Sequence, residues 1–355
     1  MKLSACLIVR NEADALPRCL SALREHVFEI VVVDTGSNDE TPVIAEQMGA
    51  NVVTLPWQDD FSVARNAALD EATGDWCLMV DADEVVQPSG WPLFDAFVAD
   101  GSHAHGNITV VSDTAEGRVH SAIRRLCRND KTFRYVGRVH EQLVGPGAGG
   151  DSGLVAVHSG YTEAAIRRRD KTARNLKLLK LELDARPHDA YVHFQLGRTL
   201  VKHKQPDVAV GHFQRALATI APDAPYLSLV VVALGYAWKT LGRAAQALPL
   251  LESYKPRLGD SPDLWFLEGL LAMETGDVPR MLRAFDTCLS LGETKRYETV
   301  EGVGSYRPHF NLGLFHELAG DVERARMHYR AALTFPGHFQ PAAHRLMRLP
   351  AQQAR

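Results

Sequence analysis

Two carboxylates stand one residue apart, Asp81 and Asp83, directly after an apolar run at residues 76–80. The run is continuously hydrophobic, which predicts a buried parallel strand rather than a strand with one face in water. Ligands of open α/β sheets bind at the carboxyl ends of parallel strands, so this is a place where a ligand is expected. A sharp turn after Val80 would let both carboxylates converge on one hard cation that stays bound to substrate phosphates. The alternative is that the pair makes a turn or caps a helix.

Further polar residues follow two earlier apolar runs. Asn11 and Glu12 come directly after the first run, and Asp34 ends the second. We expect them at the same sheet edge as Asp81, because the carboxyl ends of parallel strands lie together. Asp34 has the chemistry to accept hydrogen bonds from a base amide or a ribose hydroxyl. The alternatives without a ligand are that Asp34 is a turn residue and that Asp39 belongs to a helix N-cap region.

The elements that must hold these residues alternate in type. Short apolar runs typical of strands are separated by segments with the period of amphipathic helices. This alternation predicts βαβ units and a parallel sheet covered by helices on both faces. Beyond residue 100, the runs at 107–111 and 119–127 indicate a mixed, partly antiparallel region. We expect strands at residues 3–9, 29–33, 51–55 and 76–80, and helices at 14–25, 41–48 and 62–71.

From about residue 164 onward the sequence is helical and repetitive. Each unit has a glycine, then a mostly small residue, and four positions later a large residue. This order suits paired antiparallel helices, because the small side chain lets them approach and the large one fills the gap. It resembles the tetratricopeptide repeat, whose period is about 34 residues. The glycines are Gly197, Gly235, Gly269 and Gly313, and the large residues are Phe213, Leu251, Phe285 and Tyr329.

Composition excludes several classes of function. The chain has 355 residues, of which 39 are basic and 43 acidic, and this even balance argues against nucleic acid as a partner. Its five cysteines lie mostly in apolar segments without metal-ligand spacing, which predicts buried, reduced thiols. No apolar run reaches membrane-spanning length, and the first apolar segment is too short for a signal peptide. We therefore expect a soluble cytoplasmic protein without a transmembrane segment.

Four segments together resemble the inverting family 2 glycosyltransferases of GT-A fold. The closest likeness is to a branch in which the catalytic domain precedes tetratricopeptide-like repeats, a branch that includes S-glycosyltransferases acting on bacteriocin peptides. The resemblance implies a GT-A (Rossmann-like) α/β domain at residues 1–163 and an all-α repeat domain at residues 164–355. The segments are LIVRNE (7–12), VVVDTGSNDET (31–41), DFSVARN (60–66) and GDWCLMVDAD (74–83).

The resemblance assigns expected roles to the polar edge. Asp34 and Asp39 would bind the base, and Arg65 would lie close to the nucleotide. Asp81 is expected near the ribose and the metal, with Asp83 as the direct ligand of a divalent cation, Mn or Mg. Such a cation would neutralise the departing nucleoside diphosphate. The nucleotide-sugar-binding set is Asn11, Glu12, Asp34, Asp39, Arg65 and Asp81.

Two later residues complete the expected site. An inverting transfer needs a base on the far side of the sugar from the diphosphate, and Glu141 follows His140 where related sequences carry a His-Glu pair. Glu141 could take the acceptor proton; the alternative is a surface carboxylate on a strand edge. His158 ends a short apolar run, at a position that resembles the late histidine that GT-A enzymes bring to the metal. A structural histidine is the alternative.

The residues and the family resemblance together predict a metal-dependent enzyme that transfers a sugar from a nucleotide-sugar donor with inversion, and we expect this donor to be UDP-linked. The acceptor stays open between a peptide side chain, a lipid-linked glycan and a small metabolite. The repeats would select the acceptor or form a homodimer. One alternative is a non-catalytic scaffold that binds proteins through its repeats. Another is a nucleotidyltransferase, against which stands the absence of a Gly-rich basic loop in the sequence at residues 9–12.

Overall fold

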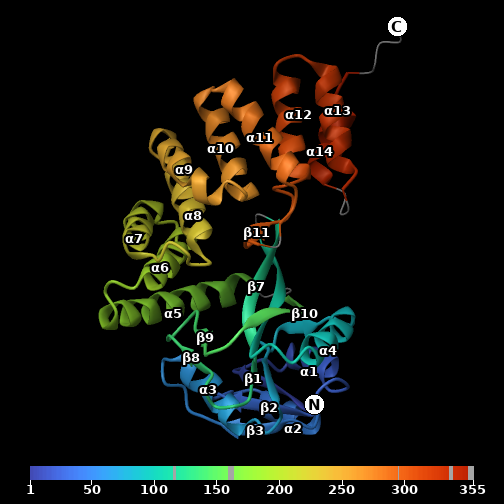
Figure 1. Cartoon of the computed structure of the whole chain (residues 1–355), viewed down its shortest axis with the longest axis vertical. Helices are drawn as coiled ribbons and strands as arrows, with labels where there is room; N and C mark the ends of the chain where they lie inside the picture. Colours follow the sequence, from blue (N-terminus) through green and yellow to red (C-terminus); the bar gives the residue numbers. More distant parts are fainter. Residues whose placement is uncertain (115–116, 159–163, 295, 336–338, 351–355) are drawn as a thin grey trace. The chain divides into compact units, whose positions relative to one another are not determined.

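The computed structural model describes residues 1–114, 117–158, 164–294, 296–335 and 339–350 (Figure 1). The chain divides into two compact units, Met1–Pro187 and His188–Arg355. An α/β unit built on a mixed sheet is followed by a unit made almost entirely of helices, as the sequence predicts.

The strands of the first unit follow the order β3-β2-β1-β4-β7-β6-β10-β5 in one mixed sheet. β1 pairs in parallel with β2 and β4, and β2 pairs in parallel with β3, which confirms the predicted parallel half. β7 runs antiparallel to β4 and β6, so the region beyond residue 100 is mixed as expected. The strands are β1 (Leu3–Val9), β2 (Glu29–Asp34), β3 (Asn51–Thr54), β4 (Trp76–Met79), β5 (Glu84–Val86), β6 (His105–Thr114), β7 (Gly117–Arg128) and β10 (Gly149–His158).

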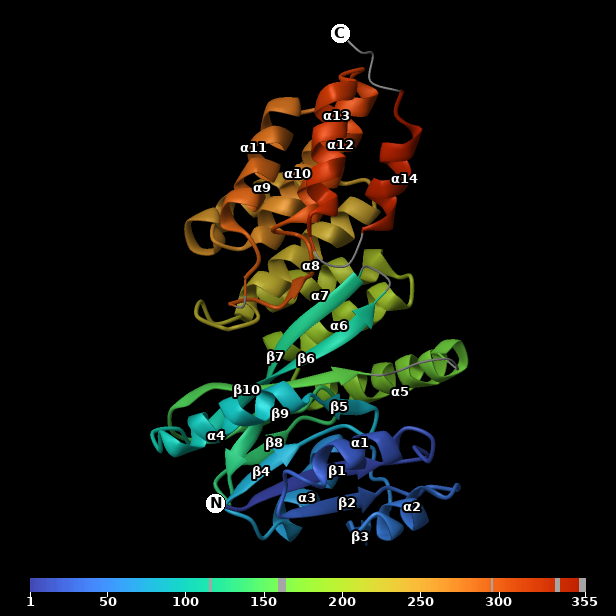
Figure 2. The same ribbon diagram turned by 90° about the vertical axis from the view of Figure 1, so that its right-hand side faces the viewer.

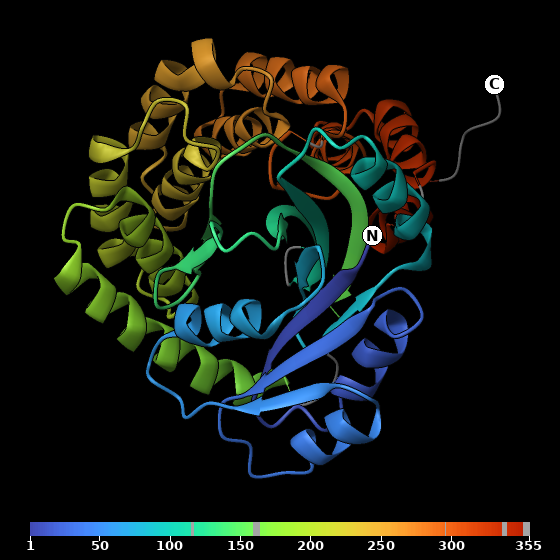
Figure 3. The same cartoon turned by 60° about the horizontal axis from the view of Figure 1, so that its bottom comes forward.

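Helices cover both faces of the parallel half of the sheet. Leu16 and Leu20 of α1 belong to the core on one face, whereas Ala64 and Ala68 of α3 belong to the core on the other. Figure 3 shows the light-blue α3 on one side of the blue strands, with the darker α1 and α2 on the other. Burial on both faces explains why these strands are continuously apolar in sequence. The helices are α1 (Leu16–Leu23), α2 (Thr41–Gln47), α3 (Phe61–Glu71), α4 (Trp91–Ala99) and α5 (Ala164–Ala185), with a 3-10 turn at Pro88–Gly90.

Two hairpins extend the first unit. β6 and β7 form a long antiparallel ribbon, whose two strands lie side by side in Figure 2. β8 (Arg134–Val136) and β9 (Gln142–Val144) form a separate two-stranded sheet. Tyr135 and Leu143 of this small sheet pack into the same core cluster as α3. The glycine-rich stretch at residues 145–150 contributes its last two residues to β10.

Helix α5 belongs to the first unit by its contacts. Lys177 Nζ lies 2.7 Å from Asp59 Oδ2, and Glu182 Oε2 accepts the Arg138 backbone N–H at 2.9 Å. The sequence pattern places the domain boundary before this helix, at residue 163, because α5 is helical like the repeats that follow. A helical period does not show which part of the chain the helix packs against. The compact units divide after Pro187, and the functional division into residues 1–163 and 164–355 stays a prediction.

The second unit consists of consecutive helix pairs in which α6 packs on α7, α10 on α11 and α12 on α13 (Figure 1). A Cβ placed on Gly197 would meet the ring of Phe213 at 2.5 Å, so the repeat glycine allows the close approach that the pattern predicts. Within the described residues, no helix is long and apolar enough to span a membrane. The elements are α6 (Ala190–Lys202), α7 (Pro206–Thr219), α8 (Leu227–Thr240), α9 (Ala244–Leu258), α10 (Pro262–Thr275), α11 (Val278–Leu291), β11 (Thr299–Val300), α12 (Tyr306–Leu318), α13 (Val322–Leu333) and α14 (Gln340–Arg348).

Candidate functional site

The chain turns sharply between β4 and β5, as the metal hypothesis for Asp81 and Asp83 requires. The Asp81 backbone N–H donates to Glu84 Oε2 at 3.0 Å, and the Glu84 N–H donates to the Asp81 carbonyl at 3.0 Å. The two aspartates nevertheless contact different partners. Asp81 pairs with two arginines, whereas Asp83 lies against His158. The turn therefore presents one charge-paired carboxylate and one carboxylate beside an imidazole.

Arg65 joins two of the predicted site residues. Its Nη2 lies 2.9 Å from Asp81 Oδ1, and its Nε donates to Glu141 Oε1. The side chains of Arg65 and Glu141 are only 9% and 8% exposed, so this pair is held away from water. The Arg65 guanidinium also lies over the ring of Tyr135, 5.4 Å from its centroid. Residues 65, 81 and 141, distant in sequence, thus meet at one place.

Arg125 and Glu84 extend this network, and sequence reasoning missed both. Arg125 on β7 places Nη2 2.8 Å from Asp81 Oδ2 and Nη1 2.6 Å from Glu84 Oε2. The only sequence signal was an arginine pair inside an otherwise strand-like segment, which does not show where either side chain points. Acidic and basic side chains thus alternate along a series of ion pairs, in the order Glu141, Arg65, Asp81, Arg125 and Glu84.

Burial and the neighbouring charges shift the ionisation of this network. Burial alone would raise the pKa of Asp81, but Arg125 and Arg65 hold it well below its usual value. The Asp81 side chain is 32% exposed, yet two guanidinium groups bind its two carboxylate oxygens. Burial raises the pKa of Glu84 to about 7 and outweighs the opposing effect of Arg125. The pKa of Asp81 is therefore well below that of Glu84, so Asp81 is the more firmly ionised of these two carboxylates.

Asp83 and His158, the two predicted metal ligands, lie side by side. His158 Nε2 is 2.9 Å from Asp83 Oδ2, and the side chains are 38% and 20% exposed. A carboxylate oxygen beside an imidazole nitrogen is a donor pair suited to Mn. In the described part of the chain, no group of three or more His, Cys, Asp or Glu residues could hold a metal. A cation held by these two residues would take its other ligands from substrate phosphates and water.

The remaining predicted residues lie in the segments that follow β1 and β2, and hydrogen bonds join these two segments. The Asn11 side chain accepts the Asn38 N–H at 2.7 Å, and the Glu12 N–H donates to Thr41 Oγ1 at 2.8 Å. Asp34 is 4% exposed and accepts the Gly36 and Ser37 backbone N–H groups at 3.1–3.3 Å. Its carboxylate therefore holds the turn after β2.

Asp39 has a similar structural role beside this turn. Its Oδ1 accepts the Thr41 N–H at 3.0 Å, and its Oδ2 accepts the Ala13 N–H at 3.3 Å. Burial opposes ionisation of Asp39, but the hydrogen bonds from Thr41 and Ala13 lower its pKa overall. These contacts fit the alternatives that involve no ligand, and binding of the base by Asp34 and Asp39 stays a prediction.

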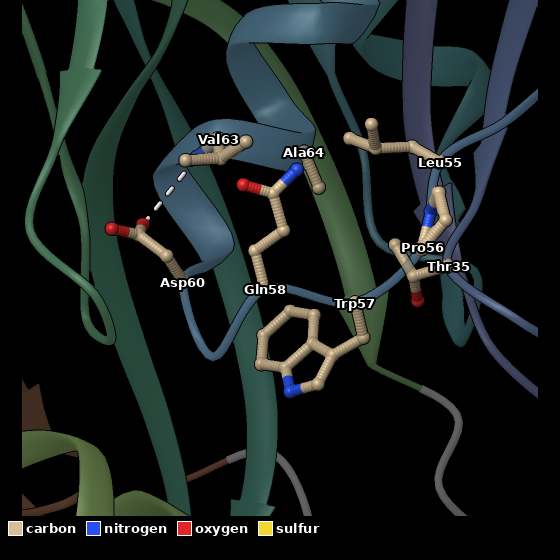
Figure 4. A pocket seen from close by; sticks show the side chains of 8 residues that line it. All are labelled: Thr35, Leu55, Pro56, Trp57, Gln58, Asp60, Val63 and Ala64. Atoms are coloured by element: carbon tan, nitrogen blue, oxygen red, sulfur yellow. Dashed lines mark hydrogen bonds between the residues drawn. The ribbon is translucent and has the colours of Figure 1, made fainter.

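A shallow surface depression that includes Thr35 lies where β2 and β3 end (Figure 4). Trp57 and Gln58 line it on the loop that follows β3. Asp60 forms its rim and caps α3, because its Oδ1 accepts the Ser62 and Val63 N–H groups at 2.8 and 3.4 Å. The full lining is Thr35, Leu55, Pro56, Trp57, Gln58, Asp60, Val63 and Ala64.

Comparison with known proteins supports both halves of this description. Residues 4–154 match the family model described as glycosyl transferase family 2. The chain is 35% identical over 241 residues to a TPR repeat-containing protein of Synechococcus elongatus, over 62% of this chain and 58% of that protein. It is 26% identical over 220 residues to the SPbeta prophage-derived glycosyltransferase SunS of Bacillus subtilis, over 59% of this chain and 52% of that protein. The chain thus spans little more than half the length of these relatives.

Among solved structures, the crystal structure of MamA covers 49% of this chain and 95% of its own, with 19% identity and a TM-score of 0.39. The matched residues 4–154 contain β2 to β7 and most of β1, together with Asp81, Asp83 and Glu141. The helix pairs follow this region, in agreement with the repeat-containing relative. Residues 4–154 are therefore similar to glycosyl transferase family 2, and the helix pairs that follow are similar to tetratricopeptide-like repeats.

Proposed function

We propose that the chain is an inverting glycosyltransferase that moves a sugar from a UDP-linked donor to an acceptor, with assistance from a divalent cation. The observation that supports this most strongly is the ion network of Arg65, Asp81 and Glu141. The family resemblance assigns these three residues to the donor and the base, and the fold brings them together at the sheet edge where α/β proteins bind ligands.

One nitrogen of the Arg65 guanidinium, Nη1, is left to bind the nucleotide-sugar donor. Its Nη1 is buried and makes no hydrogen bond to any described residue, while Nε and Nη2 are occupied. A buried N–H without a partner is costly, and a diphosphate oxygen would satisfy it with a charge-assisted bond. When bound at Asp83 and His158, a cation would supply positive charge for the leaving diphosphate. Donor binding at this edge would therefore complete the bonding of Arg65.

Glu141 is the proposed base. Its Oε1 accepts from Arg65 Nε, so the carboxylate is held in one orientation and Oε2 is the oxygen assigned to the acceptor proton. In the transfer, the acceptor atom forms a bond to the anomeric carbon as its proton passes to Glu141. The bond from that carbon to the diphosphate oxygen breaks, and its electron pair leaves with UDP.

The scaffold alternative is less well supported. Burying charged groups costs free energy that their mutual attraction only partly returns, so a domain kept only as a scaffold gains little from such a network. The acceptor class is open, and a peptide side chain is the class suggested by the resemblance. Homodimer formation through the repeats and a cytoplasmic location stay predictions.

Titration of UDP into the full chain, with and without MnCl2, tests this proposal. We expect UDP to bind more tightly with Mn, and UDP-sugars to be hydrolysed slowly with release of UDP. Asp81→Asn should weaken UDP binding, whereas Asp113→Asn should not, because Asp113 lies on the surface and pairs with Arg118. Failure of the unchanged chain to bind any nucleoside diphosphate would refute the proposal.

A further inference from the structure

Arg125 sits at an irregularity in the sheet. Across the β6–β7 ladder, Gly106 lies opposite Leu126 and Asn107 opposite Arg124, so Arg125 is an extra residue without a cross-strand partner. The β4–β7 ladder ends at the same level, with Leu78 opposite Leu126. A one-residue excess of this kind is a β-bulge, which bends the strand and redirects side chains, frequently next to active sites. The bulge thus lies where β4 ends and the turn containing Asp81 begins.

The redirected side chain reaches both ends of that turn. Arg125 is 11% exposed and bridges Asp81 Oδ2 and Glu84 Oε2 at 2.8 and 2.6 Å. The same Glu84 oxygen accepts the Asp81 backbone N–H at 3.0 Å. One planar guanidinium therefore closes a ring of contacts around the turn. A lysine ammonium has the same charge but lacks the fork needed to bridge two carboxylates.

The turn carries several negative charges, and the ion pairs of Arg125 with Asp81 and Glu84 balance two of them. Three carboxylates, Asp81, Asp83 and Glu84, stand within four residues, and Glu84 is 2% exposed. Arg65 pairs with Asp81 but is shared with Glu141. In the ion pairs of the described residues, the basic partner of Glu84 is Arg125. Without Arg125, Glu84 and Asp81 would repel each other across the turn.

We propose that Arg125 is a positioning residue that fixes the turn from Asp81 to Glu84, where the donor would bind. The β-bulge in β7 directs the Arg125 side chain toward this turn. This inference rests on the proposed function, because the turn matters only if Asp81 and Asp83 bind the donor. Arg125 touches neither donor nor acceptor in this account. It holds the Asp81 carboxylate and the backbone of the turn in the orientation that receives the donor.

The test compares Arg125→Lys with Arg124→Lys in the full chain. Arg124 lies in the same strand but pairs regularly with Asn107, so its replacement is the matched control. The readouts are UDP affinity by titration calorimetry with MnCl2, donor KM and kcat, and the melting temperature. We expect R125K to weaken UDP binding and raise donor KM about 10- to 100-fold, the range typical for residues that orient a ligand-binding group. R124K should behave like the unchanged chain, and R125K should retain its melting temperature within a few degrees.

The outcomes separate this inference from the proposed function. Unchanged UDP affinity and donor KM in R125K would overturn the inference alone, since the unchanged chain would still bind UDP. An unfolded R125K would also overturn it, because the arginine would then support the fold rather than the donor turn. An equal loss in R124K would show a general effect of charge. Absence of UDP binding by the unchanged chain would overturn the proposed function, and this inference with it.

Discussion

Replacement of Arg65 by methionine should destabilise the first unit strongly, because two carboxylates depend on this arginine. Glu141 is 8% exposed and has Arg65 as its ion-pair partner, whereas Asp81 retains Arg125 after the replacement. Removing one member of a buried pair costs about 3–5 kcal/mol, because it leaves an uncompensated buried charge. We expect the free energy of unfolding of R65M to fall by that amount at pH 7.

A double-mutant cycle with Glu141→Gln isolates the charge interaction. In the E141Q background no charge is left at residue 141, and R65M should then cost only about 1–3 kcal/mol, the value for a lost buried hydrogen bond. The difference predicts a coupling energy of about 2 kcal/mol between the two residues.

Urea unfolding of the full chain, followed by pulsed hydrogen exchange on peptides from β1 and β4, reports the first unit separately from the repeats. Methionine retains most of the aliphatic length of arginine, so the packing loss is small. A cost below about 1 kcal/mol, the usual value of an exposed pair, would refute the argument. An equal cost in the presence and absence of E141Q would also refute it, since the arginine would then stabilise the fold without the charge interaction.

Three further predictions concern the metal pair and the repeats. Asp83→Asn should raise the Mn concentration needed for UDP binding by about tenfold or more; an unchanged Mn requirement would exclude Asp83 as a ligand. Burial, reinforced by neighbouring charges, lowers the pKa of His212 and of His328 to about 4. The unfolded chain binds more protons between about pH 4 and 6.5, so the stability of the repeats should fall as the pH drops through this window, by about 1–2 kcal/mol per histidine after allowance for partial exposure. Replacing both by Gln should flatten a plot of repeat stability against pH. Gly197→Ala should cost about 1–3 kcal/mol by overpacking, whereas Gly211→Ala, where a Cβ meets nothing closer than 4.0 Å, should be neutral or stabilising in urea melts.

Much of the fold was predictable because the determining signals are local. Continuous apolar runs predicted β1, β2 and β4, and the polar residues that end them marked the sheet edge. The spacing of small and large residues predicted the repeats, and the structure gives its physical basis in the contact of Gly197 with Phe213. Such signals depend on side-chain period and volume, which a sequence shows directly.

The parts that escaped prediction depend on register and on long-range packing. Arg125, which contacts Asp81 and Glu84, lies at a β-bulge, and an extra residue in one strand cannot be recognised without its partner strand. Helix α5 has the helical period of the repeats, and only contacts such as Lys177 with Asp59 assign it to the first unit. The family resemblance placed Arg65 near the nucleotide and Glu141 at the acceptor, but not in contact with each other across 76 positions.

The central claim is that Glu141 acts as the base of a transfer whose donor is bound by other residues. Glu141→Gln tests it most directly, because glutamine keeps an oxygen that can accept from Arg65 Nε but cannot take up the acceptor proton. The measurement is UDP affinity and sugar-transfer turnover on the same E141Q preparation. The account predicts that turnover falls by about 10²–10⁴-fold while the UDP dissociation constant stays unchanged. Undiminished turnover, or a loss of UDP affinity that matches the loss of turnover, would contradict it.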